Sequence, residues 1–266
     1  MIPKVIHYCW FGGNPLPELA QKCVASWRKF FPDYEIKEWN ESNFDVNIIP
    51  YTAQAYAARK YAFVSDYARF WVLYREGGIY FDTDVEVIRP MDDIISRGSF
   101  MGCELKYNPK ATPETMYVAP GLGLCVNPGL GLLKELLDLY ATLSFLNPDG
   151  TRNQKTIVDY TTELLCKHGL KNVPDIQQVA DVWIYPNDYF APKNVDTKKL
   201  VITENTRSIH HYDASWADKA SRAAGERAPK LRRYFGARLG NLINASIYGL
   251  QQYGLLGSIK RVTKRI

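Results

Sequence analysis

Two aspartates stand one residue apart at the end of an apolar run, in the stretch GGIYFDTDVEV at residues 77–87. In extended backbone, residues two apart point to the same side, so the carboxylates of Asp82 and Asp84 can converge on one cation. Oxygen ligands of this kind select hard ions such as Mg²⁺ or Mn²⁺, and such an ion can neutralise a departing diphosphate. The pair therefore predicts a Mn²⁺ or Mg²⁺ site, although two solvated acids at a strand end give the same pattern.

Two other kinds of D-x-D site can be compared with this stretch. A calcium-binding EF-hand loop requires glycine at its sixth position, where this sequence has Val87. A haloacid-dehalogenase-type phosphatase also begins with D-x-D after an apolar strand, but it needs a second acidic pair at a later strand end. The Asp-Asp at 92–93 comes too soon for that pair. The EF-hand is excluded, and a D-x-D phosphohydrolase remains as an alternative enzyme.

The segment before this strand predicts one long helix over residues 51–76, ended by Gly77-Gly78. Arg59, Asp66 and Arg69 lie at i, i+7 and i+10 and therefore share a face of that helix. An Asp-Arg pair three residues apart on a solvated surface is worth only a few tenths of a kcal/mol. The surrounding residues are mostly aromatic or aliphatic, so the alternative is a buried helix whose charges need partners or a polar ligand.

Near the end of the globular part, HHYDASW at 210–216 brings together groups that suit a phosphate or a metal. A histidine can complete the coordination of a D-x-D metal, and an indole N–H or a serine hydroxyl can donate to a phosphate oxygen. A pair of surface histidines before a turn is the alternative interpretation. Trp10, at the end of the first expected strand, is similarly either a core residue or a stacking platform for a base.

The elements that position these residues follow from periodicity and turn residues. A strand at 4–10, a helix at 18–31 and a strand at 32–40 form a βαβ unit with a parallel sheet. Residues 79–88 are expected as a third strand interrupted by its acids. Further expected strands or loops lie at 100–105, 121–127, 182–190, 200–205 and 208–216, and further helices at 128–143 and 154–169. The order is mixed α/β, and ligands bind at the strand ends of such sheets.

Three segments together resemble the DXD-containing sugar-transferase family: IPKVIHYCWFGG at the start, SDYARFWVLYREGGIYFDTDV in the middle and IHHYDASW near the end. The family includes bacterial capsular-polysaccharide glycosyltransferases and the fungal Golgi initiating mannosyltransferase, with the large clostridial glucosylating toxins as distant relatives. The resemblance covers residues 1–216 and implies a GT-A fold: a Rossmann-like mixed sheet flanked by helices. We expect a GT-A glycosyltransferase domain at 1–218 and a basic amphipathic helical extension at 219–266.

The resemblance also implies roles for individual residues. Asp82 and Asp84 would hold the metal and through it the donor diphosphate, helped by either His210 or His211. Asp66 and Arg69 would bind hydroxyls of the donor sugar. Trp10 would stack on the nucleobase, and Trp216 with Ser215 would contact the β-phosphate. The implied catalytic set is Asp66, Arg69, Asp82, Asp84 and Trp216, and the implied donor-binding set is Trp10, Phe11, Gly12, Tyr80, Gly121, Ser215 and Trp216.

The implied reaction is retaining transfer of a hexose from a nucleotide sugar, with UDP-hexoses favoured. The acceptor would be a saccharide or a lipid-linked oligosaccharide in bacterial surface-polysaccharide synthesis. Without a placed second nucleophile, the family's expected mechanism is front-face attack by the acceptor hydroxyl. The family often shows Thr-Gly-Pro before its later helix, where this sequence has GTRNQKT at 150–156. Contacts to the acceptor therefore do not follow from the resemblance. A non-catalytic saccharide-binding or membrane-docking module remains the alternative outside enzymes.

Charge is divided unevenly along the 266 residues. From Lys219 to the end there are eleven Lys/Arg and one acidic residue, whereas the rest of the chain carries a net −5. Residues 239–259 lack charge and place apolar residues on one helical face, but their polar residues argue against a transmembrane span. We expect an interfacial helix on an anionic membrane surface, and no nucleic-acid partner. The N-terminus is unlike a signal peptide, and the five scattered cysteines suit reduced thiols, so we expect a cytoplasmic protein, peripheral on the inner face of the plasma membrane.

Overall fold

The computed structural model describes residues 1–194, 197–213 and 219–263. Its backbone divides into two units. The first comprises Met1–Asn194 and Lys199–Tyr212, and the second consists mainly of the C-terminal helix. The expected domain boundary at 218/219 stays a prediction.

The first unit is built on an eight-stranded mixed sheet in the order β2-β1-β3-β7-β5-β9-β8, with β6 paired to β5. The strands β1, β2, β3, β5 and β9 run in one direction, because β1 pairs in parallel with β2 and β3, β5 pairs in parallel with β9, and β7 is antiparallel to both β3 and β5. A second, two-stranded sheet pairs β10 with β4. The strands are β1 (Val5–Cys9), β2 (Glu35–Trp39), β3 (Gly78–Tyr80), β4 (Val85–Val87), β5 (Phe100–Cys103), β6 (Val118–Ala119), β7 (Leu124–Val126), β8 (Gln177–Val179), β9 (Val182–Tyr185) and β10 (Ser208–His210).

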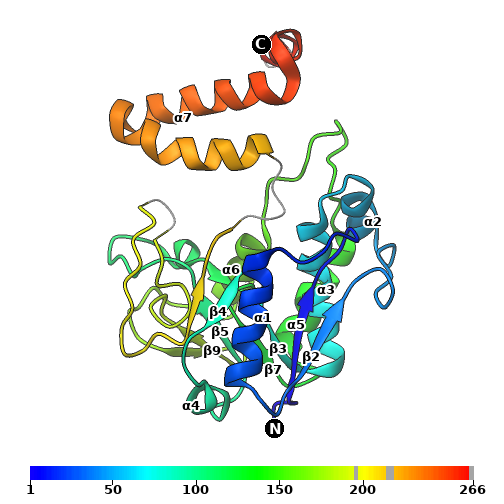
Figure 1. Ribbon diagram of the computed structural model, residues 1–266, viewed down its shortest axis with the longest axis vertical. Helices are drawn as coiled ribbons and strands as arrows, with labels where there is room; N and C mark the ends of the chain where they lie inside the picture. The colour runs from blue at the N-terminus through cyan, green and yellow to red at the C-terminus, as the bar shows by residue number, and fades with distance from the viewer. Residues whose placement is uncertain (195–196, 214–218, 264–266) are drawn as a thin grey trace. The chain divides into compact units, whose positions relative to one another are not determined.

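Helices cover both faces of the large sheet (Figure 1). Alternation along the strands sends Tyr80 to a core shared with α3, α5 and α6, and sends Ile79 and Phe81 to a core shared with α1 and β4. The fully buried ring of Trp27 from α1 lies in the second core. The predicted α/β class with a mixed sheet flanked by helices is confirmed. The helices are α1 (Glu18–Phe30), α2 (Pro50–Ala57), α3 (Tyr61–Glu76), α4 (Asp92–Ile95), α5 (Gly131–Thr142), α6 (Ile157–Lys167) and α7 (Lys219–Thr263), with a 3₁₀ turn η1 (Pro113–Met116).

The single helix expected over 51–76 is wrong, because two helices meet there. The helix α2 ends in a Schellman-type turn, in which Lys60 N–H donates to the Ala55 carbonyl and Arg59 N–H to the Tyr56 carbonyl. Arg59 has φ +55°, a conformation that usually marks glycine or asparagine at a helix end. Arg59 is exposed and precedes the first residue of α3. It therefore does not share a helix face with Asp66 and Arg69.

The expected third strand is also two separate elements. Residues 78–80 form β3 in the large sheet, whereas 85–87 form β4 in the small one. The two aspartates lie in the connection, where Val85 N–H donates to the Asp82 carbonyl across a turn. A turn therefore brings the two carboxylates together. The extended backbone that we expected from the sequence at this position is wrong.

The C-terminal helix α7 confirms the predicted helical basic extension. Among the residues that the structure describes, no helix is long and apolar enough to cross a bilayer. All five cysteines, which lie in the first unit, are free thiols.

Candidate active site

The carboxyl ends of β1, β3, β5 and β9 lie along one edge of the large sheet because these strands share a direction. Trp10 follows β1, Asp82 and Asp84 follow β3, and Glu104 follows β5. Polar residues therefore collect at one sheet edge, as expected of a ligand site in an α/β sheet.

His210 closes this edge from the far end of the chain. The antiparallel pairing of β10 with β4 sets His210 opposite Val85. Its Nε2 then lies 3.0 Å from Asp84 Oδ1, and ligand atoms of Asp82, Asp84 and His210 all lie within 4.8 Å of one another. Burial lowers the pKa of His210, but Asp84, Asp82 and Glu104 together outweigh it and raise that pKa. The structure thus gathers two carboxylates and one imidazole in one place.

His211 directly follows β10, and its side chain lies against Glu86 instead of the aspartates. Its Nε2 lies 2.8 Å from Glu86 Oε2, and Glu86 also meets Lys22 at 3.0 Å. Burial alone would raise the pKa of Glu86, but the hydrogen bonds and positive charge of Lys22 and His211 outweigh it and lower that pKa. The geometry therefore separates the two histidines: His210 lies with the aspartates, and His211 belongs to a neighbouring ion cluster.

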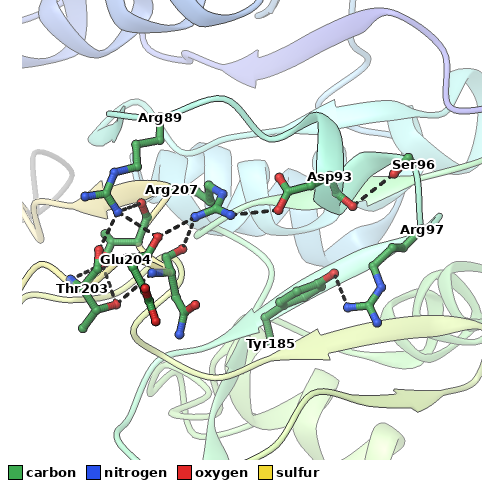
Figure 2. Close-up of polar contacts among 10 residues, drawn as sticks. Arg89, Asp93, Ser96, Arg97, Tyr185, Thr203, Glu204 and Arg207 are labelled. Carbon is green, nitrogen blue, oxygen red and sulfur yellow. Dashed lines mark hydrogen bonds and ion pairs between the residues drawn. The ribbon is translucent and has the colours of Figure 1, made fainter.

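A polar network fixes the loop that leads into β10 (Figure 2). The guanidinium of Arg89 donates to the carbonyls of Thr203, Glu204 and Thr206. Arg207 donates to the Glu204 carbonyl at 3.0 Å and to Asp93 Oδ2 at 2.8 Å, as Figure 2 shows. These bonds tie the segment just before His210 to Arg89, which follows β4, and to Asp93 of α4. The network therefore positions His210 without contacting Asp82 or Asp84.

Arg69 lies between two carboxylates on the inner side of the site. Its Nη2 is 3.1 Å from Asp66 Oδ1 and 3.2 Å from Asp82 Oδ1, and its guanidinium lies over the Tyr80 ring, 4.6 Å from the ring centroid. The Tyr80 hydroxyl donates to Asp82 Oδ1 at 3.1 Å. Burial raises the pKa of Asp66 to about 7, with Asp82 adding to this effect and Arg69 opposing it. Of the two interpretations from sequence, the buried one holds, since Arg69 is 4% exposed and Asp66 8%.

Gly121 leaves the space that the Asp82 carboxylate occupies. A Cβ at this position would lie 1.9 Å from Asp82 Oδ2 and 3.0 Å from Arg69 Nη1. The Gly121 carbonyl also accepts a hydrogen bond from the backbone N–H of Asp82 at 3.1 Å. Only a residue without a side chain permits this approach.

The residues after β1 divide into different roles. Trp10 is partly exposed, and its Nε1 donates to the Asn14 carbonyl at 2.6 Å. Phe11 is a core residue, packed edge-on against Phe44. The Gly12 N–H donates to Glu41 at 2.7 Å. The Trp10 ring therefore reaches the surface beside the site, whereas the Phe11 ring does not.

Two residues beside His210, Glu104 and Tyr212, were absent from the sequence predictions. Glu104 is largely enclosed; burial raises the pKa of its carboxyl, with His210 opposing this effect. Burial and Glu104 raise the pKa of the Tyr212 hydroxyl, and the Tyr212 ring centroid lies 4.1 Å from that of His210. Glu104 follows β5, and its position after a strand of the parallel set was the signal available from sequence. Tyr212 follows β10 of the small antiparallel sheet and lies within the HHYDASW segment. Ser215 and Trp216 lie outside the described residues, so their roles stay predictions.

The donor set fits a hard divalent ion. Two carboxylates and one imidazole are a set that Mn²⁺ and Mg²⁺ accept, with Mn²⁺ the more tolerant of nitrogen. The side chains of Asp82, Asp84 and His210 are 30%, 17% and 15% exposed, so an ion and a ligand can reach them. Arg69 and Tyr80 orient Asp82 from behind, as supporting residues do for ligands in metal sites.

Residues 17–101 match the family described as a glycosyltransferase sugar-binding region containing DXD motif. The resemblance to DXD-containing sugar transferases predicted from the sequence is confirmed over this region. Inositol phosphoceramide mannosyltransferase 1 of Schizosaccharomyces pombe is 30% identical over 111 residues, which are 38% of this chain and 33% of the relative. Inositol phosphoceramide mannosyltransferase 3 of the same yeast is 33% identical over 98 residues, covering 35% of this chain and 27% of the relative. The chain thus spans about a third of the length of these relatives.

Three solved structures similar to this chain are glycosyltransferases. The PaToxG glycosyltransferase has a TM-score of 0.44 at 22% identity, covering 62% of this chain and 69% of its own. A glycosyltransferase involved in glycosylation of the major capsid of PBCV-1 has a TM-score of 0.45 at 11% identity, covering 86% and 100%. The galactosyltransferase LgtC has a TM-score of 0.38 at 13% identity, covering 92% and 95%.

Proposed function

We propose that this protein is a metal-dependent, retaining glycosyltransferase that moves a hexose from a nucleotide sugar to a saccharide or lipid-linked acceptor. The observation that carries the proposal is the convergence of Asp82, Asp84 and His210 at the end of β3, inside the region matched by the DXD glycosyltransferase family. Synthesis of a bacterial surface polysaccharide, in the cytoplasm at the inner membrane face, is the setting we propose.

Each residue of the site has a distinct task in this proposal. Asp82, Asp84 and His210 would hold Mn²⁺ or Mg²⁺, which supplies positive charge to the diphosphate of the donor when bound. Arg69 holds the Asp82 carboxylate in place and keeps the buried Asp66 charge-paired. Asp66 accepts hydrogen bonds from hydroxyls of the donor sugar, and Trp10 stacks on the nucleobase. Trp216 and Ser215 donate to the β-phosphate.

The transfer breaks the anomeric C–O bond to the diphosphate and forms a new one to the acceptor oxygen. Negative charge develops on the departing diphosphate, where hydrogen-bond donors aimed at it lower the barrier. The acceptor hydroxyl attacks from the face that the diphosphate leaves, so configuration is retained. Its proton passes to the leaving phosphate oxygen, which balances the reaction.

The acceptor would approach from the β5–β9 side of the sheet edge. A cavity of about 280 Å³ opens there, beyond Cys103 and Pro186 at the ends of β5 and β9. Its lining includes aromatic, aliphatic and amide side chains suited to a sugar ring: Leu105, Tyr107, Asn108, Met116, Asn172 and Asn187. Glu104 lies in sequence between two lining residues, Cys103 and Leu105. The cavity and the aspartates are thus at one edge of the sheet, at the ends of parallel strands that β7 separates.

We propose a UDP-hexose as the donor, and nucleotide-linked mannose as the second donor to test. The names of the yeast relatives describe transfer of mannose to inositol phosphoceramide, a lipid. This supports testing mannose donors and lipid-linked acceptors alongside the favoured set.

Incubation with Mn²⁺ and a panel of nucleotide sugars separates the proposal from its rivals. Donor hydrolysis or transfer with retained anomeric configuration, by NMR, is the expected result. Release of phosphate from a monoester without donor turnover would instead indicate a D-x-D phosphohydrolase. Absence of both turnover and nucleotide binding would leave a non-catalytic saccharide or membrane module.

A further inference from the structure

The helix α7 is folded back on itself as a hairpin. Gly236 has φ +74°, a left-handed conformation that ends the first arm, and Figure 1 shows the two arms of α7. Asn244 Nδ2 donates to the Ala224 carbonyl at 3.0 Å. Twenty residues of straight helix would separate these groups by about 30 Å. The bond therefore requires two antiparallel arms.

Further contacts close the hairpin along its length. Arg227 donates through both Nη atoms to Gln251 Oε1 at 3.2 Å. Near the turn, a Cβ at Gly240 would lie 2.7 Å from the backbone of Leu231, so the arms approach closely there. These contacts define the residues between them, 232–239, as a projecting turn.

The turn combines exposed aromatic rings with basic side chains. Tyr234 is 79% exposed and Phe235 51%. Lys230, Arg233 and Arg238 are exposed around them, and residues 230–238 contain four basic residues and no acidic one. Exposed aromatic side chains at a tip are costly in water unless something covers them.

We propose that the turn of α7 is a membrane anchor, which inserts Tyr234 and Phe235 among the headgroups of an anionic bilayer while Arg233 and Arg238 contact the lipid phosphates. Aromatic rings favour the membrane–water interface, and basic residues beside them add attraction to anionic lipid. This differs from the flat-lying 239–259 helix expected from sequence, because the rings at the turn, and not the apolar face of one arm, enter the bilayer. It does not depend on the proposed glycosyl transfer.

Charge favours a bilayer over a second copy of the chain as the occupant. The segment from Lys219 to the end carries a formal +10, so two such turns repel each other. A surface of anionic lipid is complementary to the same charge.

Co-sedimentation of the full-length protein with vesicles tests the anchor. Phosphatidylcholine vesicles with and without phosphatidylglycerol are compared at low and high salt. We expect binding that requires phosphatidylglycerol and weakens with salt. Tyr234→Ser with Phe235→Ser should weaken it about tenfold or more, and Arg233→Gln with Arg238→Gln should reduce the preference for phosphatidylglycerol. The matched control is Leu242→Ser with Leu250→Ser, at two exposed positions of the second arm, which should bind like wild type.

Circular dichroism of each variant checks that helical content is unchanged. Failure of the wild-type protein to bind either vesicle overturns the proposal. If the Leu242→Ser, Leu250→Ser variant loses binding while the Tyr234→Ser, Phe235→Ser variant keeps it, the result supports a flat-lying helix and overturns the proposed anchor. Light scattering that shows a dimer broken by the turn substitutions, without vesicle binding, would identify a second copy as the occupant.

Discussion

His210 Nε2 lies 3.0 Å from Asp84 Oδ1, although 126 residues separate the two along the chain. The contact depends on the pairing of β10 with β4, and Ser215 and Trp216 follow His210 by a few residues in the sequence. The D-x-D motif and the last sequence motif of the site are therefore joined by a short two-stranded sheet. Anything that loosens this sheet should weaken metal binding before it unfolds the protein.

The two histidines should respond differently to substitution. His210→Ala removes a ligand atom from the three-residue group, so Mn²⁺ affinity should fall about tenfold or more. His211→Ala should change Mn²⁺ affinity little, because its imidazole contacts Glu86. Isothermal titration with Mn²⁺ on both variants measures the difference. Equal losses in the two would contradict the assignment of His210.

Asp84→Asn should abolish metal-dependent donor turnover while the fold is kept. The substitution preserves shape but removes one of the two charges that hold the ion, so we expect a loss on the order of a hundredfold or more. Donor hydrolysis with added Mn²⁺, with the circular dichroism spectrum as a check on folding, gives the result. Turnover equal to that of wild type would remove Asp84 from the site.

Local sequence signals predicted much of this fold correctly. The βαβ start, the helix end at Gly77 and most later strands follow from periodicity and turn residues. The break at Arg59 was missed because a non-glycine residue adopts the left-handed conformation there. The division of 79–88 between two sheets was missed because its partner, β10, is distant in sequence, and pairing is not encoded locally.

The site was predictable in its residues but not in its geometry. The sequence did not decide whether Asp66 and Arg69 are buried or solvated, since spacing alone does not show which face of α3 is covered. The sequence also left open the choice between His210 and His211, which the register of β10 decides. Glu104 belongs to no motif, and Tyr212 was not singled out within HHYDASW, so both enter the site only when distant segments meet in space.

Stability should depend on pH through His7. Its Nε2 donates to the Gly77 carbonyl and its Nδ1 accepts from Trp39 Nε1, both at 3.0 Å, so the ring must be neutral. Burial lowers the pKa of His7 to about 4. The unfolded chain takes up this proton near its ordinary pKa of 6.5, so stability is lost as pH falls from about 6.5 toward 4.

At pH 5 the loss assigned to His7 is about 2 kcal/mol relative to neutral pH. The comparison variant is His7→Gln, whose amide can donate and accept in the same way but does not titrate. Urea unfolding of both proteins at pH 7.5 and pH 5.0 isolates the contribution. An unfolding free energy that falls equally in both would show that other groups cause the decline.

Gly121→Ala should damage the metal site without unfolding the protein. The new Cβ would lie 1.9 Å from Asp82 Oδ2, so the carboxylate must move from its contacts with Arg69 and Tyr80. We expect Mn²⁺ affinity to fall about tenfold or more, the size of effect seen when supporting contacts of metal ligands are removed. Gly131→Ala is the matched control, because a Cβ there meets nothing within 4 Å. Thermal shift on adding Mn²⁺ measures both variants; an unchanged shift in Gly121→Ala would mean that Asp82 does not bind the ion in the position seen.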